Sequence, residues 1–279
     1  MTTGTWTVGI AQWLPTCNEP EQNLLDAVAF IGELAGRGCD LVVLPELWPS
    51  GYDPGTLARD AEAAAEPLEG PRGQALSAAA ATHGVWLFAG TVPERDNGTL
   101  YNTAVVYGPD GRLAAAHRKV HLYTPLAEDD VFSAGQEPTV LHIDGIGTVG
   151  LSTCFDGDHP AYARQLRNLG ARIVIEPAAY EVAAETWWDV LYPANALVNG
   201  QWWVMANQCG GELLGKSRII GPDAATVAEA GRVGEGGNSE LLVVTVDFDS
   251  GLHEADRTTA ALWAELPTPR QNAASHPGF

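Results

Sequence analysis

Three residues with complementary chemistry each follow an apolar stretch of the chain. Glu46 comes just after the run LVVL, Lys119 ends the run RLAAAHRK, and Cys154 directly follows GTVGLST. In α/β sheets the carboxyl ends of strands form the usual binding crevice. If these three ends meet, one pocket holds a carboxylate base, an ammonium that can stabilise an oxyanion, and a thiol nucleophile. The sequence therefore predicts a site for cysteine-dependent acyl transfer.

Cys154 has a setting that the other cysteines lack. A lone cysteine is more often a small, inert, buried side chain than a nucleophile. Cys154, however, precedes Phe-Asp-Gly, a turn that can project its side chain out of the core. Cys17, Cys39 and Cys209 have no such turn, and we interpret them as structural.

Glu46 and Lys119 also have sequence surroundings that favour a function. Glu46 lies between Pro45 and the apolar pair Leu-Trp, so we expect it to be buried, which raises a carboxylate pKa and suits a general base. Lys119 is one of two lysines, the other being Lys216, in a chain whose other basic residues are arginine and histidine. A compact ammonium can bind a developing oxyanion, although a lysine that reaches solvent is the simpler alternative.

Other candidate sites are weaker. His117, His121 and His142 could suggest a metal site or a Cys–His pair, but no further ligand can be placed, so we expect no metal and no organic cofactor. The residues around Cys154 do not match the papain-like signature. The segment GKSRIIGP (215–222) lacks the upstream glycine of a phosphate-binding loop, so no nucleotide site is expected.

The elements that must position these residues alternate between strand-like and helix-like patterns, which indicates an α/β layered fold. Pro193 is expected to kink or interrupt the last predicted helix, and Asp158 to cap the third. One domain over 1–270 with a loop-like tail, 271–279, is the simplest organisation. Predicted strands are 6–12, 41–44, 85–92, 102–107, 112–119, 147–153, 172–177, 202–208 and 241–248, and predicted helices are 21–35, 71–84, 158–169 and 186–200.

Composition excludes several classes of partner. The 279 residues are 46% hydrophobic, enough for a sizeable core, and carry a net charge of −20. Such an acidic surface repels nucleic acid and anionic membranes. No apolar run is long enough to span a bilayer, and no secretory signal is visible, so we expect a cytoplasmic protein with reduced thiols.

Together the segments resemble the nitrilase superfamily, the carbon–nitrogen hydrolases. LPEL, HRKVHL and GLSTCFD look like its three motif blocks, in the family's order. PELWPSGYD, GARIVIEPAA and GKSRIIGPDAATVAEAG resemble its later segments, so the likeness covers nearly the whole chain. The resemblance implies a four-layer α-β-β-α sandwich that pairs across a helical face as a homodimer or higher homo-oligomer.

The resemblance also implies roles for the residues. Glu46 is expected to be the general base, Cys154 the nucleophile, and Lys119 the oxyanion ligand together with the backbone N–H of Phe155. The family carries a second glutamate after the lysine. Glu128 matches it best, but the loop is one residue longer here, so Asp129 stays an alternative.

The family's branches differ in the residues after the cysteine. Nitrilases usually show Cys-Trp-Glu, whereas Cys-Phe-Asp here resembles amidases, so we expect hydrolysis of a small amide to the acid and ammonia. N-carbamoyl amine or amino-acid hydrolysis and an ω-amidase are alternatives, and a nitrilase or a non-catalytic binding protein is less favoured. Arg164 and Arg172 are candidates for binding a substrate carboxylate. The expected pocket walls are Tyr52, Tyr123, Phe155, Ala178 and Ala179.

Two stretches depart from the family's pattern. Pro160-Ala161 stands where Pro-Glu is common, and Asn195 and Val198 replace an arginine and a glutamate on a later helix. We expect these changes to affect helix packing and subunit contacts rather than the chemistry.

Overall fold

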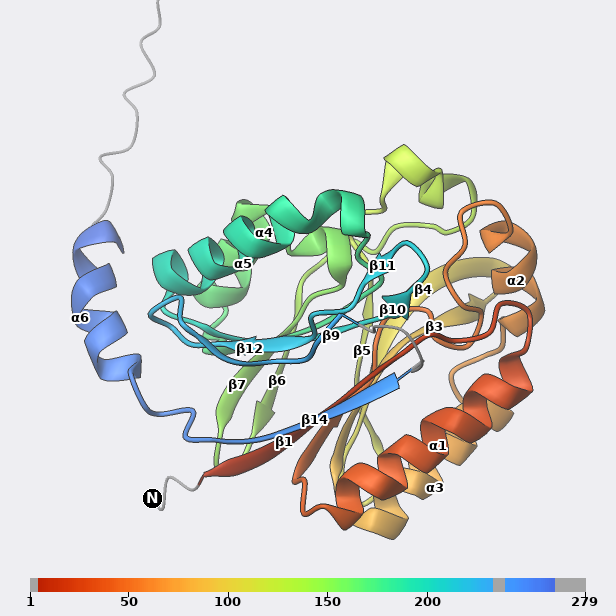
Figure 1. The fold of residues 1–279 in the computed structure, drawn as a ribbon, viewed down its shortest axis with the longest axis horizontal. Helices are drawn as coiled ribbons and strands as arrows, with labels where there is room; N and C mark the ends of the chain where they lie inside the picture. The colour runs from red at the N-terminus through yellow and green to blue at the C-terminus, as the bar shows by residue number, and fades with distance from the viewer. Residues whose placement is uncertain (1–4, 233–238, 264–279) are drawn as a thin grey trace, which may run out of the picture.

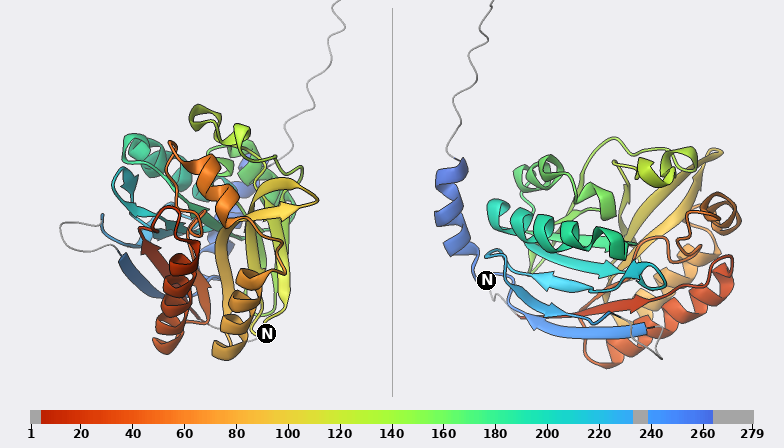
Figure 2. Two further views of the ribbon diagram at one scale, coloured as in Figure 1. Left: turned by 90° about the vertical axis from the view of Figure 1, so that its right-hand side faces the viewer. Right: turned by 45° about the horizontal axis from the view of Figure 1, so that its top comes forward.

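Two six-stranded sheets face each other, with helices on both outer sides (Figure 1). The computed structural model describes residues 5–232 and 239–263. The four layers, helix, sheet, sheet and helix, are also visible from the side (Figure 2). The predicted four-layer α-β-β-α sandwich is thus confirmed.

The first sheet has the order β14-β1-β2-β3-β4-β5. Its strands β1, β2 and β3 run parallel, and the others pair antiparallel to their neighbours. The strands are β1 (Trp6–Trp13), β2 (Leu41–Val43), β3 (Trp86–Asp96), β4 (Thr99–Tyr107), β5 (Leu113–Arg118) and β14 (Ser239–Val246).

The second sheet has the order β13-β12-β9-β8-β7-β6 and also contains three parallel strands, β7, β8 and β9. Two short strands between β9 and β12, β10 and β11, pair antiparallel with each other in a separate small sheet. The strands are β6 (Thr139–Ile143), β7 (Gly147–Leu151), β8 (Ile173–Ala178), β9 (Trp202–Asn207), β10 (Cys209–Gly210), β11 (Leu213–Leu214), β12 (Arg218–Ile220) and β13 (Thr226–Glu229).

Helices α1 and α3 cover the first sheet, and α4 and α5 cover the second (Figure 1). Short 3₁₀ turns, η1 to η4, lie mainly in the loops that follow the strands. The helices are α1 (Pro20–Gly36), α2 (Leu57–Ala64), α3 (Pro71–His83), α4 (Pro160–Asn168), α5 (Glu185–Asn199) and α6 (Leu252–Trp263), and the turns are η1 (Thr124–Leu126), η2 (Glu128–Asp130), η3 (Cys154–Asp156) and η4 (Val182–Ala184).

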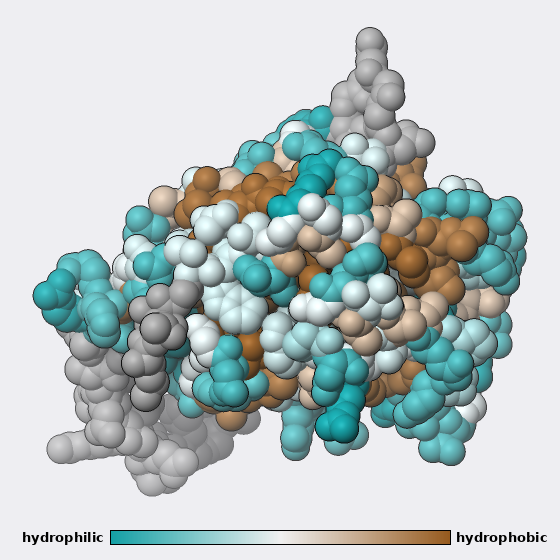
Figure 3. All heavy atoms as spheres, turned by 90° about the horizontal axis from the view of Figure 1, so that it is seen from below, coloured by the Kyte–Doolittle hydropathy of each residue, from teal (hydrophilic) through white to brown (hydrophobic). Residues whose placement is uncertain are grey.

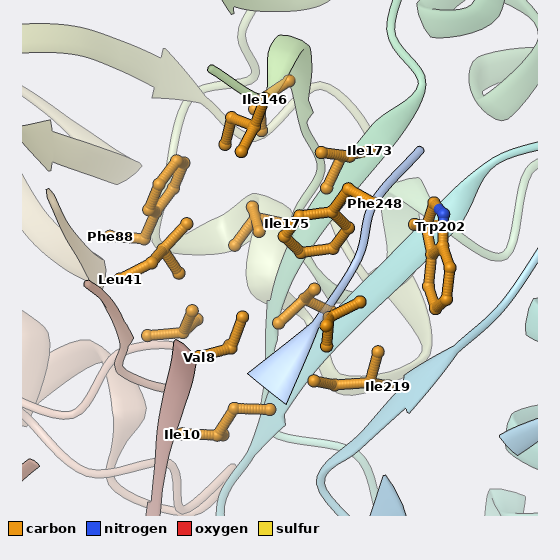
Figure 4. Close-up of a cluster of buried hydrophobic side chains, with 14 of the residues drawn as sticks. Val8, Ile10, Leu41, Phe88, Ile146, Ile173, Ile175, Trp202, Ile219 and Phe248 are labelled. Atoms are coloured by element: carbon orange, nitrogen blue, oxygen red, sulfur yellow. The ribbon is translucent and has the colours of Figure 1, made fainter. Parts of the chain in front are cut away.

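The central core lies between the two sheets. Val8, Ile10 and Leu41 of the first sheet face Ile173 and Ile175 of the second (Figure 4). Alternate residues of these strands point inward, and burying apolar surface on both sides stabilises the sandwich. The two sheets are thereby fixed face to face, and the carboxyl ends of β2 and β8 meet.

The β3–β4 hairpin extends further than the sequence pattern predicts. The strands continue to Asp96 and start again at Thr99, joined by Asn97 and Gly98 with φ of 48° and 83°. Asn-Gly suits a two-residue hairpin turn because both residues tolerate positive φ. The polar stretch PERDNGTLY hides this extension from a search for apolar strands.

One helix prediction is wrong, and another is wrong in part. Helix α5 continues through Pro193, so it is not interrupted there, while the kink stays a prediction. Its neighbours Tyr192 and Asn195 are buried, so tertiary packing outweighs the one backbone hydrogen bond that proline removes. Asp158 does not cap α4, whose N-cap position is His159, because its carboxylate accepts hydrogen bonds from Tyr180 instead.

The surface is mixed in character. Figure 3 shows one face on which hydrophilic residues lie between smaller hydrophobic areas. Among the residues described, no helix is long and apolar enough to cross a membrane. The predicted tail, 271–279, lies outside the described residues.

Candidate active site

A buried ammonium lies between two buried carboxylates. Lys119 follows β5, and its Nζ donates to Glu46 Oε1 at 2.9 Å and to Glu128 Oε2 at 2.7 Å. Glu46 and Glu128 are fully buried, and Lys119 is 1% exposed. Asp129, the alternative to Glu128, is exposed. The structure therefore places Glu128, not Asp129, against the lysine.

Asn102 joins the two carboxylates. Its Nδ2 donates to Glu46 Oε1 at 2.8 Å and to Glu128 Oε1 at 2.9 Å. Sequence reasoning missed this residue, although an amide at the start of the apolar run NTAVVY was a signal. Together these donors satisfy carboxylate oxygens that burial would otherwise leave unpaired.

The second sheet supplies the remaining ligand of Glu46. The backbone N–H of Ala179, just after β8, donates to Glu46 Oε2 at 3.0 Å. Gln208 Nε2 donates to the Glu46 carbonyl at 2.7 Å. Glu46 is thus fixed by groups from both sheets, which orients its carboxylate.

Cys154 lies in a strained turn at the end of β7. Its φ is 47°, which is uncommon for a residue with a side chain, and the next two residues complete a 3₁₀ turn. Helix α5 secures this turn: Tyr192 Oη donates to the Cys154 carbonyl at 3.0 Å, and Asn195 Nδ2 donates to the Gly157 carbonyl at 2.8 Å. The predicted projection of Cys154 by a turn is therefore seen.

Asp156 anchors the other side of the same turn. Its carboxylate contacts His117 Nε2 at 3.2 Å and His121 Nδ1 at 2.8 Å, and it accepts the backbone N–H of His121 at 2.8 Å. Burial alone would raise the pKa of Asp156, but hydrogen bonds from both histidines lower it to about 2. The cysteine turn is thereby tied to the segment that carries Lys119.

The electrostatics of the centre favour proton transfer. Burial raises the pKa of Glu46, and the Lys119 charge opposes this rise without cancelling it. Burial also opposes the charge on Lys119, yet Glu128 and Glu46 hold its pKa well above the usual range. The pKa of Cys154 is raised by burial and by the charge of Glu46, so the thiol is protonated and needs a base.

A cavity of about 430 Å³ opens above Cys154. Four of the five predicted walls line it, namely Tyr52, Tyr123, Phe155 and Ala179. The fifth does not: Ala178 is fully buried in the core between β8 and the outer helices. Successive strand residues point to opposite faces, so adjacent Ala178 and Ala179 could not both face the cavity.

Several cavity residues were not predicted. The walls that the sequence did not suggest come from the η1 turn, the link between η3 and α4, the loop after β8 and the start of α5, which no single motif marks. They are Pro125, Leu126, Asp158, Tyr180, Glu181, Ala183, Ala184 and Trp187. Arg164 and Arg172 do not line the cavity: Arg164 donates to the Val198 carbonyl, and Arg172 pairs with Asp256 of α6. Within the described part of the chain, no group of three or more His, Cys, Asp or Glu residues could hold a metal ion.

Comparison with known proteins gives relatives along almost the full chain. The carbon-nitrogen hydrolase family model matches residues 7–257. The 2-oxoglutaramate amidase of Bacillus subtilis is 34% identical, covering 81% of this chain and 87% of the relative. Omega-amidase NIT2 of Xenopus tropicalis is 31% identical, covering 82% and 83%, and a nitrilase of Pyrococcus abyssi is 34% identical, covering 86% and 89%.

Solved structures agree with the fold. Saccharomyces cerevisiae Nit3, a member of branch 10 of the nitrilase superfamily, superposes with a TM-score of 0.80 at 25% identity, covering 96% of this chain and 97% of Nit3. An amidase from Nesterenkonia sp. gives a TM-score of 0.78 at 25% identity, covering 94% and 98%. The predicted family is confirmed: the chain belongs to the carbon–nitrogen hydrolases of the nitrilase superfamily, hydrolases of carbon–nitrogen bonds other than peptide bonds.

Proposed function

We propose that the chain is an amidase that hydrolyses a small carboxylic amide to the acid and ammonia through a thioester on Cys154. The observation that carries the proposal is the buried Lys119 ammonium, held by Glu46 and Glu128 beneath the cavity that Cys154 lines. Amidases and ω-amidases among the relatives support it.

The first half-reaction forms the acyl-enzyme. The amide carbonyl oxygen binds Lys119 Nζ and the backbone N–H of Phe155. Glu46 takes the thiol proton as Cys154 attacks the carbonyl carbon, and the negative charge develops on oxygen. The tetrahedral intermediate collapses as protonated Glu46 gives its proton to the departing nitrogen, which leaves as ammonia.

The second half-reaction releases the acid. Glu46 takes a proton from water, the resulting hydroxide attacks the thioester carbonyl, and the carbon–sulfur bond breaks. The thiolate of Cys154 regains its proton from Glu46. Glu128 holds Lys119 in place throughout, and Asn102 holds Glu46. Glu128 accepts hydrogen bonds from Lys119 and from Asn102, and Asn102 also donates to Glu46.

Ammonia release from a matched panel tests the proposal. The panel holds propionamide, propionitrile, glutamine and N-carbamoyl-β-alanine, each with wild type and with Cys154→Ala. We expect release from an amide, abolished by the substitution. Release mainly from the carbamoyl compound or the nitrile would move the chain to the carbamoylase or nitrilase branch, and no release by a folded protein would favour a binding protein.

Lys119→Ala is the second arm of the test. Removing an oxyanion donor lowers kcat by about a hundredfold or more. The control is Lys216→Ala, which removes the other lysine of the sequence. Lys216 pairs with Asp189 away from the cavity. Near-full turnover by a folded Lys119→Ala protein would contradict the assigned role.

We further propose a homodimer or higher homo-oligomer that forms through the outer face of α5. Trp187, Val190 and Leu197 follow helical spacing and are 57%, 57% and 48% exposed. Apolar side chains gathered on one face typically mark an interface.

We also propose a cytoplasmic location. Cys17, Cys39 and Cys154 are free thiols, as a reducing compartment would keep them.

A further inference from the structure

The charged side chains on the cavity wall are all acidic. Among the described residues that line it, Asp158 and Glu181 carry charge, and no lysine, arginine or histidine is present. Lys119 does not line the cavity, and its buried ammonium is already held by two carboxylates. A ligand in this cavity therefore meets negative charge beyond the reacting centre.

Asp158 forms no ion pair with a basic side chain of the described residues, although, against the larger effect of burial, the charge of Lys119 lowers its pKa. Tyr180 Oη donates to Asp158 Oδ1 at 3.0 Å and to Oδ2 at 2.9 Å, but within residues 5–232 and 239–263 no ion pair joins Asp158 or Glu181 to a basic side chain. Burial raises the pKa of Asp158 to about 6. A cation entering the cavity would stabilise the ionised form of this carboxylate.

The other walls are suited to the same kind of ligand. Five aromatic rings line the cavity, and their faces attract cations while their edges and the alanines accommodate a short alkyl chain. The rings belong to Tyr52, Tyr123, Phe155, Tyr180 and Trp187.

We propose that Asp158 and Glu181 form a cation-binding end of the substrate cavity, so that the preferred substrates are small amides bearing an ammonium or similar cationic group. The inference rests on the proposed amidase function, and it names the substrate class of that site. Hydrolysis runs as above: the amide nitrogen leaves as ammonia, and the cationic group is unchanged.

The inference separates this chain from its relatives. An anionic amide such as 2-oxoglutaramate, after which the Bacillus subtilis relative is named, would place a carboxylate against Asp158 and Glu181. Like charges in a cavity of low polarity repel, because little water screens them. The ω-amidase alternative is thus disfavoured on the charge of the walls.

Three amides of similar length and different charge test the inference: 4-aminobutanamide, pentanamide and succinamate. We expect kcat/KM to be highest for the cationic amide and lowest for the anionic one. The preference for 4-aminobutanamide over pentanamide should be about tenfold, from a cation–π contact and a nearby carboxylate together. In Asp158→Asn with Glu181→Gln it should fall toward one.

Glu212→Gln is the matched control. Glu212 is exposed and does not line the cavity. It lies next to the loop that does, because its carbonyl accepts a hydrogen bond from the backbone N–H of Val182 at 2.8 Å. This variant removes a negative charge near the cavity but outside its walls, so the substrate preference should stay that of wild type. An equal loss of preference in Glu212→Gln would overturn the assignment, because a diffuse surface field would then explain it.

Binding to Cys154→Ala by calorimetry makes the test independent of turnover. Tighter binding of 4-aminobutanamide than of pentanamide, lost in the Asp158→Asn, Glu181→Gln background, supports the cation site even if none of the three amides is hydrolysed. Equal binding of 4-aminobutanamide and pentanamide, or tighter binding of succinamate, overturns the cation site. The proposed amidase function is judged separately, by whether hydrolysis of an amide depends on Cys154.

Discussion

At the scale of single residues, Asn102 controls the base without being one. Its Nδ2 donates to Glu46 Oε1, and this hydrogen bond lowers the pKa of Glu46 against the larger effect of burial, which raises it. A donor to the charged form of an acid favours ionisation. After burial, the charges of Lys119 and Glu128 and the hydrogen bond from Lys119, Asn102 therefore contributes to the pH range in which Glu46 can accept a proton.

Asn102→Ala should shift the acidic limb of the kcat/KM profile to higher pH. The base must be ionised to act, and losing the donor raises its pKa, so activity should be lost at a higher pH as the solution is acidified. A pH–rate profile of both proteins measures this. Asn97→Gly, in the same hairpin but exposed, should leave the limb in place, and a limb that moves to lower pH in Asn102→Ala would contradict the argument.

Glu176 of β8 gives a prediction about stability. It is fully buried beneath the cysteine turn, and burial raises its pKa well above the ordinary value, so the folded protein keeps it protonated. The unfolded chain releases that proton once the pH exceeds the ordinary carboxyl pKa. The contribution of Glu176 to the free energy of unfolding is therefore greatest at acidic pH. It is lost as the pH rises toward the pKa that Glu176 has in the folded protein.

Glu176→Gln should remove that fall. Between pH 5 and 8 the free energy of unfolding of the wild type should decline relative to the variant, by up to about 1.4 kcal/mol per pH unit. Urea unfolding at several pH values measures the difference. Asp129→Asn, which removes an exposed carboxylate, should parallel the wild type, and a parallel curve for Glu176→Gln would show that Glu176 is ionised in the fold.

At the scale of elements, the two faces of α5 have different roles. Its outer face carries exposed apolar residues, and its inner face holds the cysteine turn through Tyr192 and Asn195. The departure from the family's pattern at Asn195 is thereby explained in this chain, because the amide bonds the Gly157 carbonyl. Helix packing and the position of the nucleophile are coupled.

Tyr192→Phe should loosen the turn while keeping the core filled. The ring stays packed, and one hydrogen bond to the Cys154 carbonyl is lost, which lowers stability by about 1 kcal/mol. We expect kcat to fall several-fold, because the turn that carries the nucleophile is held less firmly. Thermal unfolding and steady-state kinetics check both. The control is Tyr101→Phe on β4, where the ring lies beside Arg118. An unaltered kcat in Tyr192→Phe would show that the hydrogen bond from α5 does not position the nucleophile.

The sequence predicted most elements because their apolar periodicity is strong. The strands that precede Glu46 and Cys154 are predicted by their short apolar runs, and the three motif blocks identified the family. The Asn97–Gly98 extension was missed because its strands are polar. That α5 continues through Pro193 could not be predicted, because burial of the neighbouring residues is a tertiary effect. Asp158 was assigned to a helix cap, since nothing local shows that Tyr180 reaches it.

The site divides in the same way. Glu46, Lys119 and Cys154 were predictable from type and position at strand ends. Asn102 and Glu181 were not. Asn102 lies inside strand β4, and its partners Glu46 and Glu128 come from distant parts of the sequence. Glu181 lies in the loop after β8, which no motif marks. Ala178 and Ala179 could be separated only by the strand's facing direction. That 1–270 forms one domain stays a prediction.

At the scale of the whole molecule, the α5 face predicts self-association. Val190→Asp would put a charge into an apolar contact that meets its symmetry copy, which should weaken the dimer by roughly a hundredfold or more. Sedimentation at several concentrations measures the shift to monomer. Leu113→Asp also charges an exposed apolar residue, 42% exposed on β5, and should leave assembly unchanged. A Val190→Asp protein that sediments as wild type would place the interface elsewhere.

The pairing of β1 with β14 has a consequence for biosynthesis. Trp6 pairs with Val246 and Trp13 with Ser239, so the first strand of the chain meets its outer neighbour only when the last strand has been made. While the ribosome is translating the residues between them, one edge of a largely buried strand has no partner, and such edges recruit other chains. Slow elongation before β14 is complete would lengthen the time for which this edge of β1 stays unpaired.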